Sequence, residues 1–219
     1  MTKDHFIFDM DGVIVDSEPA HKEILKKVFE ELSLDFSDAY HQTLVGMAAI
    51  PMWEKIKLDF DIETNARELM NFHKEFLFIE MDAQSVEAVP GVLDFLQQLK
   101  TLDFRISLAS SSSIKLIEQF INNLEITSYF DYLVSGENVV RSKPNPDIFL
   151  KVADNYKVDP ARFLVIEDSR NGVKAAKAAG MTCIGFRNVN SGNQDLSSAD
   201  IIVDSFAELT SEKIKQLAS

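Results

Sequence analysis

The stretch that decides the fold reads His5-Phe6-Ile7-Phe8-Asp9-Met10-Asp11-Gly12. Its first four residues form a short apolar run, which stops at two acidic residues and a glycine. Such a run, bounded by turn-forming residues, is typical of a buried strand that ends in a loop. We therefore predict a strand over residues 5–8 and a polar loop directly after it.

The second half of the chain alternates between strand and helix patterns. Short apolar runs predict strands over 104–109, 132–134, 163–166, 182–186 and 201–203. Helical spacing of apolar residues predicts helices over 92–102, 114–124, 146–156, 172–179 and 206–217. Because such alternation forms βαβ units, we expect an α/β fold with a Rossmann-like, three-layer core, its parallel sheet covered on both faces.

A long helical pattern separates the first strand from the others. From Pro19, which suits a first helical turn, to about Glu80 the apolar residues keep helical spacing. We predict a catalytic core of residues 1–15 and 87–219, interrupted by an all-helical insertion of residues 16–86. Ligands of such sheets bind beyond the carboxyl ends of the strands, so an insertion that leaves the first strand there is expected to act as a cap.

Composition excludes several classes of partner. The formal net charge of −13 argues against nucleic acid and anionic membranes, because both attract clustered Lys and Arg. We find no apolar stretch long enough to span a membrane and no signal-peptide pattern. Since Cys183 is the single cysteine, no intramolecular disulfide can form, and a reducing cytoplasm is the expected compartment.

Acidic residues follow the first and fourth predicted strands. Asp9 and Asp11 are two positions apart, a spacing that points both side chains the same way in extended chain. Two facing carboxylates repel each other unless a cation or a proton intervenes, and Mg²⁺ prefers such oxygen ligands. Glu167 and Asp168 could bring further carboxylates to the same cation. A plain turn in the first loop, and a helix cap at the second position, are the structural alternatives.

Ser110 and Lys143 are expected near the same sheet edge. The Ser110 hydroxyl, with the backbone N–H of Ser111, could bind an anion at a helix start, although a plain N-cap is the simpler explanation for a serine that stands alone there. Lys143 precedes Pro144-Asn145-Pro146, which holds the local backbone extended. The alternative for Lys143 is a solvated surface charge.

Four ordered motifs together resemble those of the haloacid dehalogenase-like hydrolases, in the helical-cap subgroup close to β-phosphoglucomutase and small sugar-phosphate phosphatases. They read Phe8-Asp9-Met10-Asp11-Gly12-Val13, Leu108-Ala109-Ser110, Ser142-Lys143-Pro144-Asn145-Pro146 and Ile166-Glu167-Asp168-Ser169. The resemblance spans the whole chain.

This resemblance implies a set of site residues. Asp9 would be the nucleophile that forms an aspartyl-phosphate, and Asp11 the general acid and base. Mg²⁺ would be held by Asp9, the backbone carbonyl of Asp11, Asp168 and, directly or through water, Glu167. Catalysis and phosphate binding would further use Ser110, the Ser111 N–H and Lys143.

The expected substrate is a small phosphorylated metabolite, and related enzymes suggest a monomer. The related mutases carry a histidine where His21 stands, so a substrate or hinge role competes with that of a polar helix-end residue. They also carry an arginine shortly after the cap glycine, whereas Gly46 is followed here by Met47-Ala48-Ala49-Ile50-Pro51. The missing cation favours hydrolysis over mutase activity. A non-catalytic binding protein is the remote alternative, but it would be expected to lose at least one of the acids.

Overall fold

The computed structural model describes residues 2–45, 47, 49–80 and 86–219. It divides into two compact units, which we name the core unit (1–16 and 87–219) and the helical unit (17–86). Asp16 belongs to the core unit and not to the helical insertion expected over residues 16–86. Its N–H donates to the Glu87 carbonyl (2.9 Å), and its carboxylate accepts a hydrogen bond from Asn190 Nδ2 (2.6 Å).

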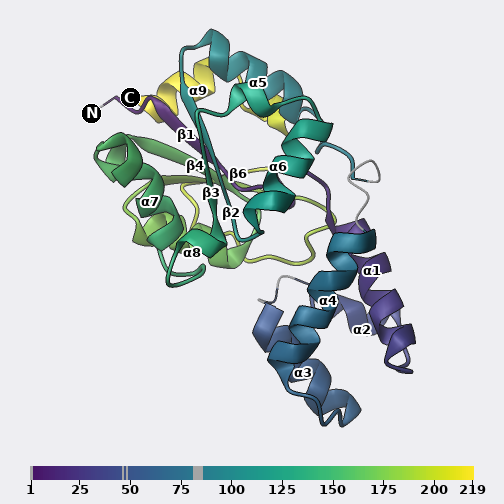
Figure 1. The fold of residues 1–219 in the computed structure, drawn as a ribbon. Coiled ribbons are helices and arrows are strands. Elements are labelled where there is room, and N and C mark those ends of the chain that lie inside the picture. The colour runs from purple at the N-terminus through teal and green to yellow at the C-terminus, as the bar shows by residue number, and fades with distance from the viewer. Residues whose placement is uncertain (1, 46, 48, 81–85) are drawn as a thin grey trace. The chain divides into compact units, whose positions relative to one another are not determined.

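A six-stranded parallel sheet forms the centre of the core unit (Figure 1). Its strand order is β3-β2-β1-β4-β5-β6. The strands are β1 (His5–Phe8), β2 (Arg105–Ser110), β3 (Tyr132–Ser135), β4 (Phe163–Glu167), β5 (Thr182–Phe186) and β6 (Ile201–Val203). The predicted α/β class is thereby confirmed, and β1 lies in the middle, between β2 and β4.

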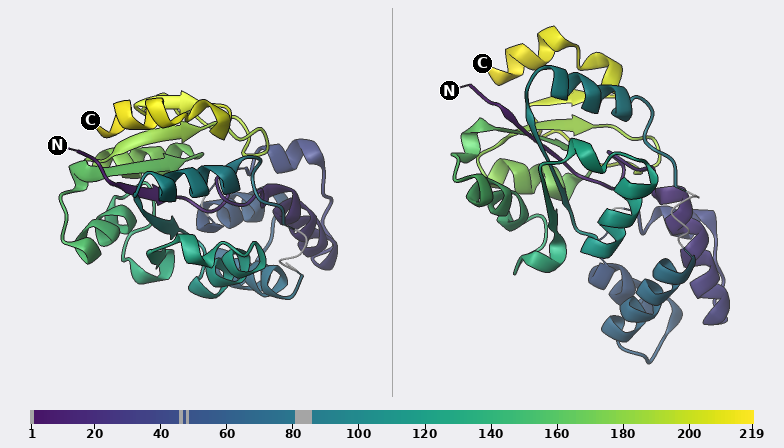
Figure 2. Two further views of the ribbon diagram at one scale, coloured as in Figure 1. Left: turned by 90° about the horizontal axis from the view of Figure 1, so that it is seen from above. Right: turned by 45° about the horizontal axis from the view of Figure 1, so that its top comes forward.

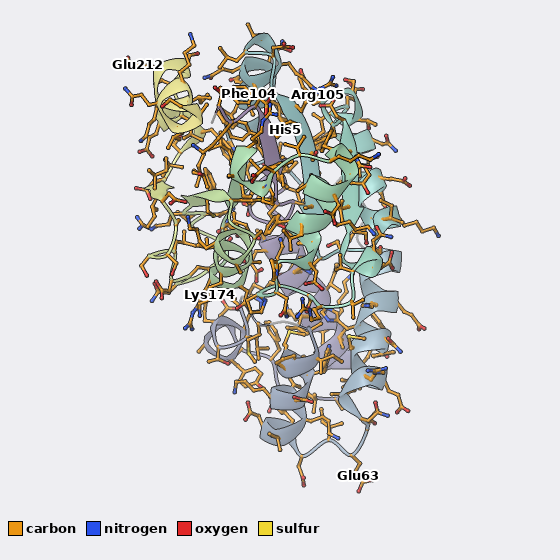
Figure 3. All side chains as sticks on the ribbon, turned by 90° about the vertical axis from the view of Figure 1, so that its left-hand side faces the viewer. His5, Glu63, Phe104, Arg105, Lys174 and Glu212 are labelled. Carbon is orange, nitrogen blue, oxygen red and sulfur yellow. The ribbon has the colours of Figure 1, made fainter. Side chains whose placement is uncertain are left out.

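The register fixes which residues share each edge of the sheet. At the start of β1, His5 lies beside Arg105 of β2 and Phe163 of β4. Figure 3 labels His5, Phe104 and Arg105 together at this amino edge. At the other end, Phe8 pairs with Leu108 and Ile166, so the residues that follow Phe8 and Ile166 emerge together at the carboxyl edge.

Side-chain alternation along β1 gives the sheet two apolar faces. Ile7 belongs to a buried cluster with residues of α7 (Asp147–Tyr156) and α8 (Arg170–Ala178). Phe6 and Phe8 point the other way, and both ring centroids lie 5.9 Å from that of Phe95 on α5 (Val92–Thr101). Figure 2 shows these helical layers from two further directions. The remaining core helices are α6 (Ile114–Asn123) and α9 (Ser211–Ala218).

The end of the chain differs from the prediction of one helix over 206–217. A short 3-10 turn, η5 (Phe206–Glu208), comes first, and α9 starts only at Ser211. The hydroxyl of Ser205 accepts the Ala207 N–H (3.2 Å), and that of Thr210 accepts the Lys213 N–H (3.3 Å). Each hydroxyl starts its own helical segment, because an N-cap satisfies amides that lack a partner within the helix.

The helical unit contains α1 (Glu18–Glu31), α2 (Asp38–Gln42), α3 (Ala49–Phe60) and α4 (Ala66–Glu80). Its helices pack around an apolar cluster of Leu25, Val28, Phe29, Leu44, Trp53, Ile56 and Leu69. Gly46 and Ala48, which belong to the segment that lacks the cap arginine, lie outside the described residues. Among the residues that the structure describes, no helix is both long and apolar enough to cross a membrane.

Candidate active site

The loop after β1 holds two aspartates at the carboxyl edge of the sheet. The Asp9 N–H donates to the Ile166 carbonyl (3.0 Å), which extends the pairing with β4 by one residue. The chain then turns sharply, because the amides of Val13, Ile14 and Val15 all point at the Met10 carbonyl (3.3, 2.8 and 3.0 Å). Gly12 has φ +77° in this turn, a conformation that glycine adopts without strain.

Three carboxylates meet where β1 and β4 end. Asp9, Glu167 and Asp168 each offer an oxygen, and these oxygens lie within 4.8 Å of one another. All three residues are buried, Glu167 completely. The two strands are neighbours in the sheet, so the parallel topology alone brings these distant residues together.

Lys143 enters this cluster from the loop before α7. Its Nζ lies 2.5 Å from Asp9 Oδ1 and 2.6 Å from Glu167 Oε1, and its side chain is only 9% exposed. The alternative of a solvated surface lysine is therefore wrong.

Burial dominates the electrostatics of the cluster. It raises the pKa of Asp9, and Glu167 and Asp11 raise it further, although Lys143 opposes them. Burial likewise raises the pKa of Asp168 well above its usual range. Burial alone would lower the pKa of Lys143, but Asp9 and Glu167 outweigh it and raise that pKa. If all three carboxylates are ionised, their negative charge exceeds what the Lys143 ammonium balances, so the cluster takes up either protons or an additional cation.

The backbone around the carboxylates is shaped to hold them. Glu167 Oε2 accepts hydrogen bonds from the Ser169 N–H and hydroxyl (both 2.9 Å). A Cβ at Gly172 would overlap the Glu167 carboxylate, and one at Gly12 would overlap that of Asp168. The N-cap of α8 is Ser169, whose hydroxyl accepts the Gly172 N–H (3.0 Å), so the helix-cap alternative for Glu167 and Asp168 is wrong.

This donor set fits a hard divalent cation. Buried carboxylate oxygens that converge on one point are the ligands such ions prefer. The two glycines leave room for these carboxylates and fix where they lie.

Asp11 lies in a different environment from Asp9. Its Oδ2 accepts hydrogen bonds from Ser112 Oγ (3.1 Å) and, at longer range, Ser110 Oγ (3.5 Å). Ser110 is fully buried, and its hydroxyl accepts the Ser112 N–H (3.0 Å). The N-cap of α6 is Ser113, so the N-cap alternative for Ser110 is wrong.

Ser111 and His21 were predicted to bind substrate, whereas the contact of Ser112 with Asp11 was not predicted. Ser111 is exposed in the turn between β2 and α6. His21 lies partly buried on α1 of the helical unit, and its substrate role stays a prediction. Ser112 was missed because nothing in a run of four serines marks which hydroxyl faces the acid.

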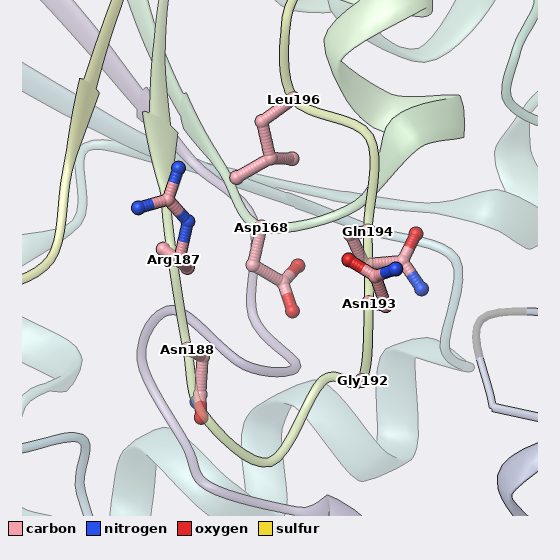
Figure 4. A pocket seen from close by; sticks show the side chains of 7 residues that line it. All are labelled: Asp168, Arg187, Asn188, Gly192, Asn193, Gln194 and Leu196. Carbon is pink, nitrogen blue, oxygen red and sulfur yellow. The ribbon is translucent and has the colours of Figure 1, made fainter.

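The loop after β5 also borders the cluster. A small hollow of about 40 Å³, partly open to solvent, is lined by Asp168, Arg187, Asn188, Gln194 and their neighbours. In Figure 4 the Asp168 carboxylate points into this hollow, between Asn188 and Gly192. The hydroxyl of Ser191 donates to Asp168 Oδ2. Sequence reasoning missed Ser191, because an Asn- and Ser-rich loop carries no recognisable pattern.

Comparison with known proteins decides the family. The family model described as haloacid dehalogenase-like hydrolase matches residues 6–186. The chain belongs to this family. All the carboxylates of the cluster, together with Asp11, Ser110 and Lys143, lie within the matched range of this haloacid dehalogenase-like hydrolase.

Relatives include both phosphatases and mutases. The phosphorylated carbohydrates phosphatase of Thermotoga maritima is 31% identical over 80% of this chain and 81% of its own. The β-phosphoglucomutase of Bacillus subtilis is 32% identical over 96% and 93%. The crystal structure of β-phosphoglucomutase from Clostridium difficile has a TM-score of 0.79 at 26% identity and covers 99% of this chain and 97% of that one.

Proposed function

We propose that this protein is a magnesium-dependent phosphatase that hydrolyses a small phosphorylated carbohydrate through an aspartyl-phosphate on Asp9. One observation carries the proposal: two aspartates of a single loop lie in opposite surroundings. Asp9 is in the buried carboxylate cluster, and Asp11 is held by serine hydroxyls. Carboxylates whose environments differ in this way can divide the roles of nucleophile and proton carrier.

In the proposed reaction, Asp9 attacks phosphorus in line, and the bond to the leaving alcohol breaks. Asp11 gives its proton to the leaving oxygen. It then takes a proton from the water that hydrolyses the aspartyl-phosphate. The Ser112 hydroxyl, 3.1 Å from Asp11 Oδ2, would orient the acid for both transfers.

Mg²⁺ would be held by Asp9, Asp168, the Asp11 carbonyl and, directly or through water, Glu167. When bound, it would neutralise charge that develops on the phosphoryl oxygens.

Lys143 and Ser110 would stabilise the same developing charge from the protein. The Lys143 ammonium is fixed by two carboxylates, so it is already in place before substrate arrives. A preorganised cation needs little rearrangement during the reaction, which is why such groups contribute strongly to catalysis. The Ser110 hydroxyl and the Ser111 N–H would add hydrogen bonds to the phosphate.

We assign the choice of substrate to the helical unit, with His21 as a binding residue. Both a carbohydrate phosphatase and phosphosugar mutases are among the relatives, which supports a phosphorylated carbohydrate as substrate. Residues 47–51 contain no arginine, and this favours hydrolysis of a monophosphate over transfer between the two positions of a bisphosphate.

A phosphate-release screen across phosphorylated sugars, with and without Mg²⁺, tests the proposal. Wild-type protein should release phosphate only with the metal, and Asp9→Asn should lose at least about a thousandfold in kcat while its circular dichroism spectrum stays unchanged. Full activity of Asp9→Asn would refute the assignment of Asp9 as the nucleophile. With β-glucose 1-phosphate and catalytic bisphosphate, glucose 6-phosphate in place of free phosphate would establish a mutase.

A further inference from the structure

The loop that follows β5, residues 187–196, connects three parts of the carboxyl edge. Its Ser191 hydroxyl donates to Asp168 Oδ2, which follows β4. Its Asn188 Nδ2 donates to the Gly12 carbonyl (3.0 Å), in the loop after β1. Its Gln194 Oε1 accepts the Arg170 N–H at the start of α8 (3.1 Å). The loop is thus hydrogen-bonded to both segments that supply the carboxylates.

Several bonds within the loop fix where the Ser191 hydroxyl lies. The Ser191 N–H donates to the Asn188 carbonyl (3.2 Å), and the Ser191 carbonyl accepts from Gln194 Nε2 (3.1 Å). Asn188 is itself buried, and its Oδ1 accepts the Asn190 N–H (2.8 Å). Ser191 is therefore held from both sides along the chain.

The opposite side of Asp168 is bounded by Gly12. A Cβ at Gly12 would overlap Asp168 Oδ2 and lie 2.7 Å from Ser191 Oγ. The carboxylate of Asp168, the Ser191 hydroxyl and the Gly12 backbone consequently occupy one closely packed corner. Rotation of the carboxylate would break the bond from Ser191 or bring Oδ2 against the loop.

We propose that Ser191 is a positioning residue, which holds the Asp168 carboxylate so that it binds the cation of the cluster through one oxygen. The inference rests on the proposed function, because it assumes a divalent cation between Asp9, Glu167 and Asp168. In this role Ser191 would act on the cation only through Asp168, to which its hydroxyl donates.

The physical reason is the geometry that Mg²⁺ demands. This ion requires nearly ideal octahedral coordination. A carboxylate that rotates freely loses conformational entropy when it binds the ion, and this loss weakens binding. A donor that occupies one oxygen leaves the other oxygen to the metal. Loss of such partners usually lowers metal affinity by about 10- to 100-fold.

Binding of Mn²⁺, followed by electron paramagnetic resonance of the free ion, tests the role without any turnover. Ser191→Val and Ser191→Thr form a matched pair, since the two side chains have the same shape and only threonine has a hydroxyl. Ser191→Val should weaken Mn²⁺ binding by about 10-fold or more, and Ser191→Thr should restore it toward the wild-type value. Ser197→Ala is the control. Ser197 lies directly after this loop, and its exposed hydroxyl donates to another carboxylate, that of Asp195 (2.6 Å).

Steady-state kinetics give a second readout. The Mg²⁺ concentration for half-maximal rate should rise in Ser191→Val, while kcat at saturating Mg²⁺ stays within about threefold of wild type. A purely structural role predicts loss of kcat that metal does not restore, and equal behaviour of the valine and threonine variants. Either result overturns the inference.

Asp168→Asn separates this inference from the proposed function. If Asp168→Asn weakens Mn²⁺ binding and Ser191→Val leaves it unchanged, the role of Ser191 is refuted and the metal site stands. If the wild type does not bind Mn²⁺, or if Asp168→Asn binds it as tightly as the wild type, the proposed metal site is refuted. The role of Ser191 is then refuted with it.

Discussion

The two ends of the sheet treat carboxylates in opposite ways. At the amino edge, Asp131 accepts hydrogen bonds from the Ile106 N–H (2.8 Å), Lys100 Nζ (3.0 Å) and Arg105 (3.2 Å). Burial raises the pKa of Asp131, but these three partners outweigh it and hold the pKa below its usual range. At the carboxyl edge, three buried carboxylates are arranged around Lys143, and burial raises the pKa of Asp9 and of Asp168.

The difference shows which carboxylates serve the fold. Asp131 accepts hydrogen bonds from two cationic side chains, Lys100 and Arg105, so its ionised form stabilises the folded chain. At the other end, ionising all three buried carboxylates costs stability unless a cation binds, and the raised pKa values of Asp9 and Asp168 reflect this cost. Such a cost is expected where a site serves ligand binding and chemistry.

The largest expected effect is a difference in kcat/KM between two variants, each with a lysine replaced by methionine at one end of the sheet. Lys143→Met should lower kcat/KM by about 100- to 1,000-fold, because it removes the buried cation that we propose stabilises the reacting phosphate. Lys100→Met, at the amino edge, should leave kcat/KM within about twofold. Comparable losses in both variants would mean that the effect arises from the fold and not from the site.

Addition of Mg²⁺ should stabilise the protein through the carboxyl edge alone. At a concentration about 100-fold above Kd, binding to the folded state contributes about 2.7 kcal/mol, which a rise of the thermal midpoint would report. Asp168→Asn should show a smaller rise, and Asp131→Ala the full one. An equal rise in Asp168→Asn would exclude this carboxylate from the metal site.

Removal of the amino-edge carboxylate should affect stability without affecting chemistry. Asp131→Ala should lower the free energy of unfolding by about 2 kcal/mol in urea titrations, since the Ile106 amide loses its charged acceptor. Turnover should stay at the wild-type value. Asp204→Ala, which breaks an exposed pair with Arg187 (2.9 Å), should cost less than about 1 kcal/mol and is the matched control.

The smallest effect is a dependence on pH. Since its folded pKa is depressed, Asp131 contributes stability that is fully present above the unfolded value of 3.8 and is lost as the pH falls through the folded value. The stability difference between wild type and Asp131→Ala should therefore be constant near pH 7 and shrink below about pH 4. A difference that is the same at pH 3 and pH 7 would refute the assignment.

The sequence predicted the sheet well because its strands are buried on both faces. Continuous apolar runs such as Phe163–Ile166 mark such strands, and the acidic residues after them mark the edge. Asp9, Ser110, Glu167 and Asp168 were predicted from their positions at strand ends, whereas Lys143 was predicted from the prolines that follow it. Polar contacts from irregular loops could not be found, because the hydroxyls of Ser112 and Ser191 reach the acids only through tertiary structure.

Boundaries that depend on caps were also missed. The chain from Phe206 to Leu217 has helical spacing throughout, yet Ser205 and Thr210 divide it into two segments. Periodicity describes which face is buried, whereas a hydroxyl that captures an amide decides where a helix starts.

Gly172 limits how this protein can be made more stable. Replacement of a helical glycine by alanine normally gains about 1 kcal/mol, and α8 is otherwise rich in alanine. Here the added methyl group would occupy the space of the Glu167 carboxylate. Mutagenesis libraries selected for heat resistance alone should therefore accept alanine at this position only together with a changed residue 167, and the variants so obtained would have lost a ligand of the proposed metal site.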